Sequence, residues 1–123
     1  MHTSLSSSPL QRAAAALVLI AGCMATAQAM TIREMRTLEK TEKQGSTYTD
    51  YYLVGVMEGA IEAQAQAVRA GAQPTICLNG RRLEPSMTKN LYTTELKRNA
   101  DLYEADMPVQ LVLVNALSTV YPC

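Results

Sequence analysis

Histidine is nearly absent from this chain of 123 residues, whose one histidine is His2. Because His2 lies in an N-terminal segment that we expect to be removed on export, the remaining chain has no histidine. A Ser-His or Cys-His nucleophile pair and a His-based zinc site are therefore excluded. The sequence predicts a protein that is not an enzyme and that binds neither a metal nor a cofactor.

Other signatures of chemistry and of nucleic-acid binding are also missing. The three cysteines, Cys23, Cys77 and Cys123, include no Cys-x-x-Cys pair, which argues against a thioredoxin-like redox role. No phosphate-binding loop or dinucleotide-binding glycine pattern occurs. Basic and acidic residues number eleven each, so loss of Arg12 with the export signal leaves a formal charge of −1. This balance gives no basic surface for nucleic acid.

The N-terminal apolar stretch is short. It covers residues 13–21, follows Arg12, and falls well short of the roughly 20 residues of a membrane-spanning helix. A basic residue, a short apolar stretch and then small residues are typical of a secretory signal peptide. We therefore expect residues 1–29 to be a signal peptide and residues 30–123 to form one domain in the periplasm.

Two processing routes fit this N-terminal segment. Residues 27–29, Ala-Gln-Ala, have the small-x-small form that signal peptidase cleaves, which would make Met30 the first residue. Residues 19–23, Leu-Ile-Ala-Gly-Cys, instead resemble a bacterial lipoprotein box, in which Cys23 is lipidated and becomes the N-terminus. The first route is favoured, so a membrane association is expected only if Cys23 is lipidated.

Both routes leave Cys77 and Cys123 as a pair in the folded part of the chain. An even number of cysteines in an exported chain indicates a disulfide. For closing the loop between Cys77 and Cys123, the chain-entropy model gives about 4 kcal/mol as an upper estimate of the stabilisation. Because a chain of this size buries only a modest core, such a covalent link is expected to contribute much of its stability.

Two helical patterns open the domain. In residues 31–43, Ile32, Met35 and Leu38 recur every three positions between charged residues, which predicts a short helix with Thr31 as its N-cap. Gly45 is the expected stop of this helix. Residues 46–70 predict a central helix, on whose apolar face we expect the following residues: Leu53, Met57, Ile61, Gln64 and Val68.

Two glycines, Gly55 and Gly59, lie four residues apart inside the central helix. Each costs about 1 kcal/mol relative to alanine in a helix interior. We therefore expect them to permit the close approach of a neighbouring helix. Glu58 and Glu62 exclude a membrane dimer motif here, and we expect both carboxylates on a solvated face rather than in acid–base catalysis.

Two more helices are expected in the second half of the domain. Residues 71–84 form a loop with a tight turn at Asn79-Gly80, and Pro85 opens a helix through residue 98. Residues 107–120 are ambiguous, because their β-branched side chains favour a strand. Helical spacing nevertheless relates Val109, Leu113, Ala116 and Val120, and Pro108 suits a first helical position. We predict a final buried helix, and hence an all-α, small four-helix domain with one disulfide.

The candidate functional residues lie on the surface. The segment between the third and fourth helices carries four candidates for protein binding: Asp101, Leu102, Tyr103 and Glu104. A loop on a rigid scaffold is suited to such binding, and a solvated connector is the alternative. The tyrosines of the central helix are expected mainly in the core, with partner contact as the alternative, and the Arg81-Arg82 pair is expected to be solvated.

Three short motifs resemble one protein family in their order and spacing. They are Tyr-Leu-Val-Gly-Val at residues 52–56, a loop cysteine at Cys77, and the ending Ala-Leu-x-x-x-Tyr-Pro-Cys at residues 116–123. This pattern looks like the Rap/Tai type of immunity protein against type VI secretion amidase effectors. Many relatives have a further cysteine just before the first motif, where this chain has Thr49 and Asp50.

The resemblance implies a function that the composition does not show. It implies an exported, all-helical and often dimeric immunity protein that binds a secreted peptidoglycan amidase and blocks its active-site groove. On this reading Cys77 and Cys123 match the family's loop and terminal cysteines, and Gly55 matches its helix glycine. The alternative is a general periplasmic helical protein, either a small chaperone or an accessory lipoprotein, without a dedicated effector.

Overall fold

A computed structural model describes residues 28–123, so Cys23 and almost all of the predicted signal peptide lie outside the described residues. Within this range the protein is all-helical, with four α-helices and no β-strand. The helices are α2 (Ile32–Thr41), α3 (Gly45–Arg69), α4 (Thr88–Arg98) and α5 (Val109–Val120). Two single 3-10 turns, η1 (Pro85–Met87) and η2 (Ala100–Leu102), flank α4. The predicted fold class is confirmed for this part of the chain.

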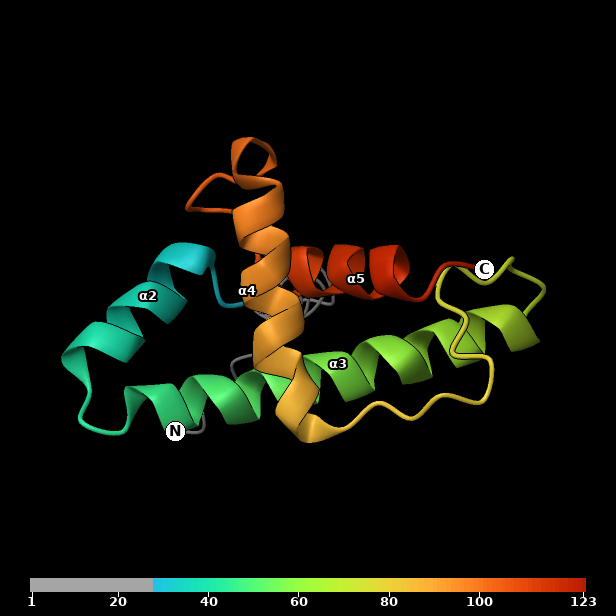
Figure 1. Ribbon diagram of the computed structural model, residues 1–123, viewed down its shortest axis with the longest axis horizontal. Coiled ribbons are helices and arrows are strands. Elements are labelled where there is room, and N and C mark those ends of the chain that lie inside the picture. Colours follow the sequence, from blue (N-terminus) through green and yellow to red (C-terminus); the bar gives the residue numbers. More distant parts are fainter. Residues whose placement is uncertain (1–27) are drawn as a thin grey trace, which may run out of the picture.

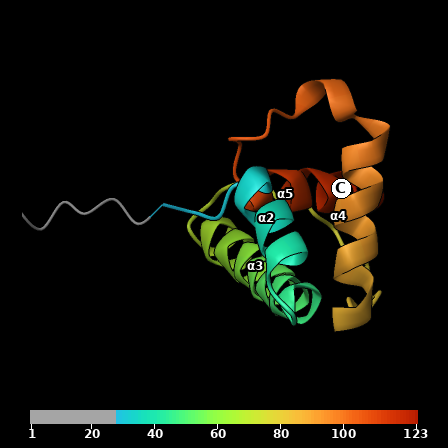
Figure 2. The same cartoon turned by 90° about the vertical axis from the view of Figure 1, so that its left-hand side faces the viewer.

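The helices pack around α3 and α5, which run side by side in the same general direction (Figure 1). Helix α2 packs against α3, and α4 crosses and contacts both α3 and α5 (Figure 1). The view from the side shows α4 along one side of the other helices (Figure 2). The far end of α4 and the turn η2 therefore project beyond the body of the domain.

Helix α2 begins with the N-cap that the sequence predicts. The backbone N–H of Glu34 donates to Thr31 Oγ1 at 3.1 Å, and the N–H of Thr31 donates to Glu34 Oε2 at 2.7 Å. This reciprocal capping box satisfies two of the backbone donors that a helix start leaves free. The backbone N–H and the hydroxyl group of Thr31 both donate to the Glu34 carboxylate, and these two hydrogen bonds lower its pKa.

Gly45 has a different role from the one predicted, because α2 already ends at Thr41 and Gly45 is the first residue of α3. It is buried, and a Cβ added to it would lie 2.1 Å from the carbonyl oxygen of Leu38. The backbone of α3 can approach the last turn of α2 this closely only without a side chain. The glycine is required by the contact between two helices rather than by a helix stop.

The explanation predicted for Gly55 and Gly59 is wrong. Both residues are exposed, and a Cβ added at either would meet no atom within 4 Å. No helix within residues 28–123 approaches them. Two residues assigned to apolar faces are also largely exposed: Val68 at 39% and Val120 at 43%. Both lie near the C-terminal ends of their helices.

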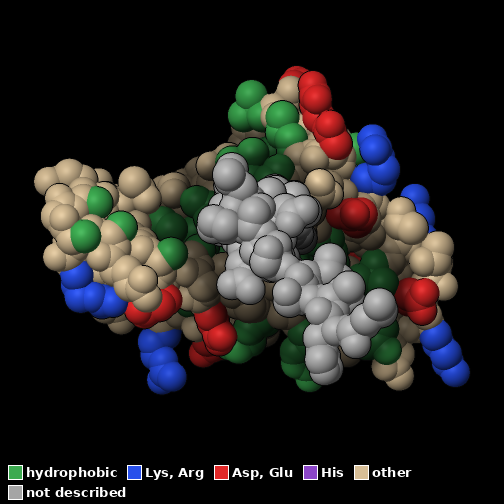
Figure 3. All heavy atoms as spheres, turned by 180° about the vertical axis from the view of Figure 1, so that it is seen from behind, with side chains coloured by type: hydrophobic (Ala, Val, Ile, Leu, Met, Phe, Trp, Pro, Cys, Tyr) green, Lys and Arg blue, Asp and Glu red, His purple; other side chains and the backbone are tan. Residues whose placement is uncertain are grey.

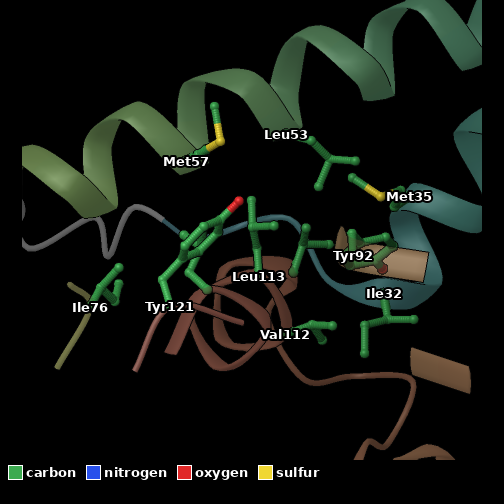
Figure 4. Close-up of a cluster of buried hydrophobic side chains, with 11 residues drawn as sticks. Ile32, Met35, Leu53, Met57, Ile76, Tyr92, Val112, Leu113 and Tyr121 are labelled. Carbon is green, nitrogen blue, oxygen red and sulfur yellow. The ribbon is translucent and has the colours of Figure 1, made fainter. Parts of the chain in front are cut away.

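The hydrophobic core lies where α2, α3, α4 and α5 meet, and Figure 4 shows its side chains pointing toward one another between the helices. Val109, Val112, Leu113 and Leu117 of α5 are fully buried, which makes α5 the central element of the core. The ambiguity of residues 107–120 is thereby resolved in favour of a helix. Pro108 has an extended backbone and is the N-cap of α5, one position before the predicted one.

The Cys77–Cys123 disulfide is present, with the two Cα atoms 4.8 Å apart. Two further contacts hold the loop and the C-terminus together. The N–H of Cys77 donates to the carbonyl oxygen of Tyr121 at 2.8 Å, and the Arg81 guanidinium lies 4.6 Å from the centre of the Tyr121 ring. The loop also has the predicted tight turn, since Asn79 and Gly80 both have positive φ.

Gln64 of α3 fixes the other side of this loop. Its Oε1 accepts hydrogen bonds from the backbone N–H groups of Thr75 and Ile76 at 2.9 and 2.7 Å. Its Nε2 donates to the carbonyl oxygen of Ile76 at 2.6 Å. One side chain on the partly buried face of α3 therefore satisfies three backbone groups of the loop, which positions Ile76 in the core.

The segment just before α2 is anchored to the start of α5. The N–H of Val109 donates to the carbonyl oxygen of Met30 at 2.9 Å, and the N–H of Ile32 donates to that of Met107 at 3.0 Å. The backbone N–H of Met30 also lies 3.2 Å from the hydroxyl oxygen of Tyr52, to which it donates. These contacts begin directly after the predicted signal peptide.

None of the helices in residues 28–123 combines the length and apolar character of a membrane span.

Candidate functional site

The predicted partner-binding residues lie at the end of the molecule formed by η2 and the residues that follow it, which we call the acidic tip (residues 101–104). Asp101, Leu102 and Glu104 are exposed, and the Leu102 side chain is 65% accessible. From behind, apolar and acidic side chains gather at this same end (Figure 3). The tip thus presents a large apolar side chain between two carboxylates.

Tyr103 differs from its neighbours in the tip, because it is partly buried. Its hydroxyl group donates to Glu95 Oε1 at 2.7 Å and accepts from Asn115 Nδ2 at 2.9 Å. Burial raises the pKa of Tyr103, and the hydrogen bond to Glu95 raises it further. The phenol therefore connects the tip to both α4 and α5, which gives Tyr103 a structural role.

Glu95 is the centre of this polar cluster and was not identified from the sequence. It is only 4% exposed, and its Oε1 accepts from Asn99 Nδ2 at 2.9 Å as well as from Tyr103. A periodic signal was available, since Thr88, Tyr92 and Glu95 are the buried residues of α4 and follow one another at spacings of four and three. A glutamate at such a position is easily taken for part of a solvated face.

The tyrosines of α3 divide between surface and interior. Tyr52 packs against the core, whereas Tyr48 and Tyr51 are 51% and 75% exposed. The expectation that these three side chains are mainly core residues is therefore wrong for two of them. Tyr51 instead lines a shallow groove with Val54 and Pro85, on a face of the molecule separate from the acidic tip.

A charged cluster joins α2, α3 and α4. Lys89 of α4 forms an ion pair with Glu39 of α2 and lies 3.5 Å from Asp50 of α3. Thr49, which is fully buried, donates from its hydroxyl group to Glu39 Oε1 at 3.0 Å. Partial burial would raise the pKa of Glu39, but the hydrogen bonds from Lys89 and Thr49 outweigh it and lower that pKa. These contacts link the three helices to one another, which gives the cluster a structural role.

Glu58 and Glu62 are exposed, as expected. Glu62 accepts from Gln66 and from Arg69, and these hydrogen bonds lower its pKa. Arg81 and Arg82 are both exposed, as expected, and Arg81 in addition donates to the carbonyl oxygens of Leu78 and Cys77. One arginine of the predicted solvated pair therefore holds the disulfide-bearing loop.

Between residues 28 and 123, no group of three or more histidine, cysteine, aspartate or glutamate side chains is arranged to hold a metal ion. The described residues define a small all-helical domain that is closed by one disulfide and bears an acidic tip. No family model matches this chain, and neither a curated protein nor a solved structure matches it.

Proposed function

We propose that this protein is an exported immunity protein that binds and inhibits a peptidoglycan amidase delivered by type VI secretion. The observation that carries the proposal is the position of the residues on which the family resemblance rests. Leu53, Ala116, Leu117 and Tyr121 are all at most 4% exposed. Leu53, Leu117 and Tyr121 belong to one core cluster, and the Cys77–Cys123 disulfide ties the loop to the C-terminus two residues after Tyr121, so the three motifs lie in one structural unit.

The shape of the acidic tip supports an inhibitor that acts by blocking a cleft. The tip projects beyond the body of the domain on α4 (Figure 1), and Tyr103 fixes it by hydrogen bonds to two helices. A preorganised loop loses little conformational freedom when it binds. Leu102 is the apolar contact, and Asp101 and Glu104 are the charged residues beside it.

Export to the periplasm is part of this proposal. Disulfides persist in oxidising compartments such as the bacterial periplasm. Cleavage before Met30 is compatible with the fold, because the new amino group could still donate to the Tyr52 hydroxyl at the position of the present N–H. The intact mass of the mature protein distinguishes a chain that begins at Met30 from one that is lipidated at Cys23.

Periplasmic co-expression tests the proposed function. Cells that produce an amidase encoded beside this protein's gene are expected to lyse, and cells that also produce this protein with its signal peptide are expected to grow. Production without residues 1–29 should give no protection, because the inhibitor would remain in the cytoplasm. Lysis that continues at the same rate with the exported protein present would overturn the proposal.

A further inference from the structure

A groove of about 410 Å³ lies between α4 and α5, and none of the exposed residues of the acidic tip lines it. We call it the α4–α5 groove. Its volume lies within the range of about 300–1,000 Å³ that is common for ligand sites. Its walls include the apolar side chains Leu91, Ala116, Val120 and Tyr121, together with the charged residues Glu95 and Arg98.

Glu95 gives this groove a specific chemistry. Its Oε1 accepts two hydrogen bonds, from Tyr103 and Asn99, whereas no residue of the described chain donates to its Oε2. Every fully buried side-chain oxygen or nitrogen within residues 28–123 has a hydrogen-bond partner. Because Oε2 has none, it must still reach solvent, and the groove is the surface that Glu95 lines.

A carboxylate oxygen that little solvent reaches, on a residue of which 96% is hidden, gains from a direct charged donor. A cation that enters the groove would supply that donor in a site of lowered dielectric, where the pairing is stronger than at the surface. The apolar walls suit the aliphatic stem of a basic side chain, which has the same division into an apolar body and a charged end.

We infer that the α4–α5 groove binds a lysine or arginine side chain of a protein partner, whose charged end pairs with Glu95 Oε2. The inference rests on the proposed function only in that the occupant belongs to a protein. Arg98 follows Glu95 by three residues on α4 and lines the same groove. Its positive charge opposes the entry of a second cation and so limits the affinity for an isolated basic peptide.

The test is a titration of the purified domain, with its disulfide intact, followed by the NMR shifts of the Leu91 and Val120 amides. The probes are acetyl-Leu-Lys-Leu-amide and the matched peptide with norleucine in place of lysine, which lacks the ammonium group. The lysine peptide is expected to bind at millimolar concentrations, and the norleucine peptide is expected to bind about tenfold more weakly.

Two variants complete the test. Glu95→Gln keeps an oxygen acceptor for Tyr103 and Asn99, so the fold should remain while the affinity for the lysine peptide falls about tenfold or more. Arg98→Gln removes the opposing charge and should tighten the same binding.

Equal binding of both peptides, unchanged binding by Glu95→Gln, or loss of binding by Arg98→Gln would overturn the inference. So would n-butylammonium binding as tightly as the lysine peptide, since the site would then favour free amines. The titration contains no amidase, so its failure is distinct from a failure of the protection experiment.

Discussion

The hydroxyl group of Tyr103 lies 2.7 Å from Oε1 of Glu95, although the two residues belong to an exposed segment and to the interior face of α4, respectively. Tyr103→Phe removes this donor and keeps the ring. We expect the free energy of unfolding to fall by about 1.5 kcal/mol, because Glu95 loses one of its hydrogen bonds in a buried position. Urea denaturation measures the change.

Leu102→Ala provides the control for Tyr103→Phe, since Leu102 is the neighbouring residue and is 65% exposed. Its effect on stability is expected to stay within about 0.5 kcal/mol. Equal urea midpoints for Tyr103→Phe and the unmodified protein would show that this hydrogen bond contributes nothing to stability.

The disulfide is the next target. Cys77 and Cys123 are 46 positions apart, and replacing both by serine is expected to lower the free energy of unfolding by up to about 4 kcal/mol, because the unfolded chain regains the freedom of an open loop. Thermal unfolding by circular dichroism measures this. A reductant should destabilise the native protein and leave the double variant unchanged, and equal sensitivity of the two proteins would contradict the prediction.

Substitution by alanine is expected to have opposite effects on stability at Gly45 and at Gly55. Gly45→Ala places a Cβ 2.1 Å from the Leu38 carbonyl oxygen, and the resulting displacement of α2 from α3 is expected to cost about 2 kcal/mol or more. Gly55→Ala meets open space and should stabilise the helix by about 1 kcal/mol. Both values come from urea denaturation. Destabilisation by Gly55→Ala would show that this face approaches another surface, such as a second copy of the chain.

The lowered pKa of Glu39 predicts acid sensitivity. The ionised carboxylate of Glu39 stabilises the folded protein. This contribution is fully present above the ordinary pKa of 4.5, which applies to the unfolded chain, and it is lost as the pH falls through the lower pKa of the folded state. Thermal melts across this range should show a decline that is smaller in Glu39→Gln than in the unmodified protein. Glu58→Gln, a change on the exposed face of α3, is the matched control, and an identical decline for both variants would exclude Glu39 as a cause.

The helices could be predicted from the sequence because their signals are local. Each of these signals acts over a few residues: the spacing of three between Ile32, Met35 and Leu38, the capping residue Thr31, and the turn at Asn79-Gly80. The disulfide followed from counting cysteines in a chain that was expected to be exported. In residues 107–120, helical spacing outweighed β propensity, because a fully buried helix tolerates valine when its faces are covered.

The polar interior could not be predicted in the same way. Glu95 looks solvated in the sequence, and Gln64 was expected on the apolar face of the central helix without any sign of its polar partners. Their hydrogen bonds to residues distant in the sequence, Tyr103 for Glu95 and the backbone of residues 75–76 for Gln64, show that both side chains are structural. The glycines were misinterpreted for a related reason. Whether a glycine marks a close approach depends on what lies opposite, and that is a tertiary property.

The charge on the acidic tip should matter for partner binding. Asp101→Lys is expected to weaken the complex with the amidase about tenfold, because it reverses a charge at the projecting end of the molecule. Isothermal titration calorimetry with the purified proteins measures the dissociation constant. Glu58→Lys makes the same change in charge on α3, away from the tip, and should leave the affinity unchanged. Equal effects of the two variants would remove the tip from the interface.

Inhibition of the amidase is measured most directly by the hydrolysis of purified peptidoglycan by the neighbouring amidase as increasing amounts of this protein are added. If this domain blocks the active-site cleft of the amidase, hydrolysis should fall in proportion to the protein added and should end near one inhibitor per enzyme. Hydrolysis that continues at its full rate in a large excess of the disulfide-intact protein would contradict the account.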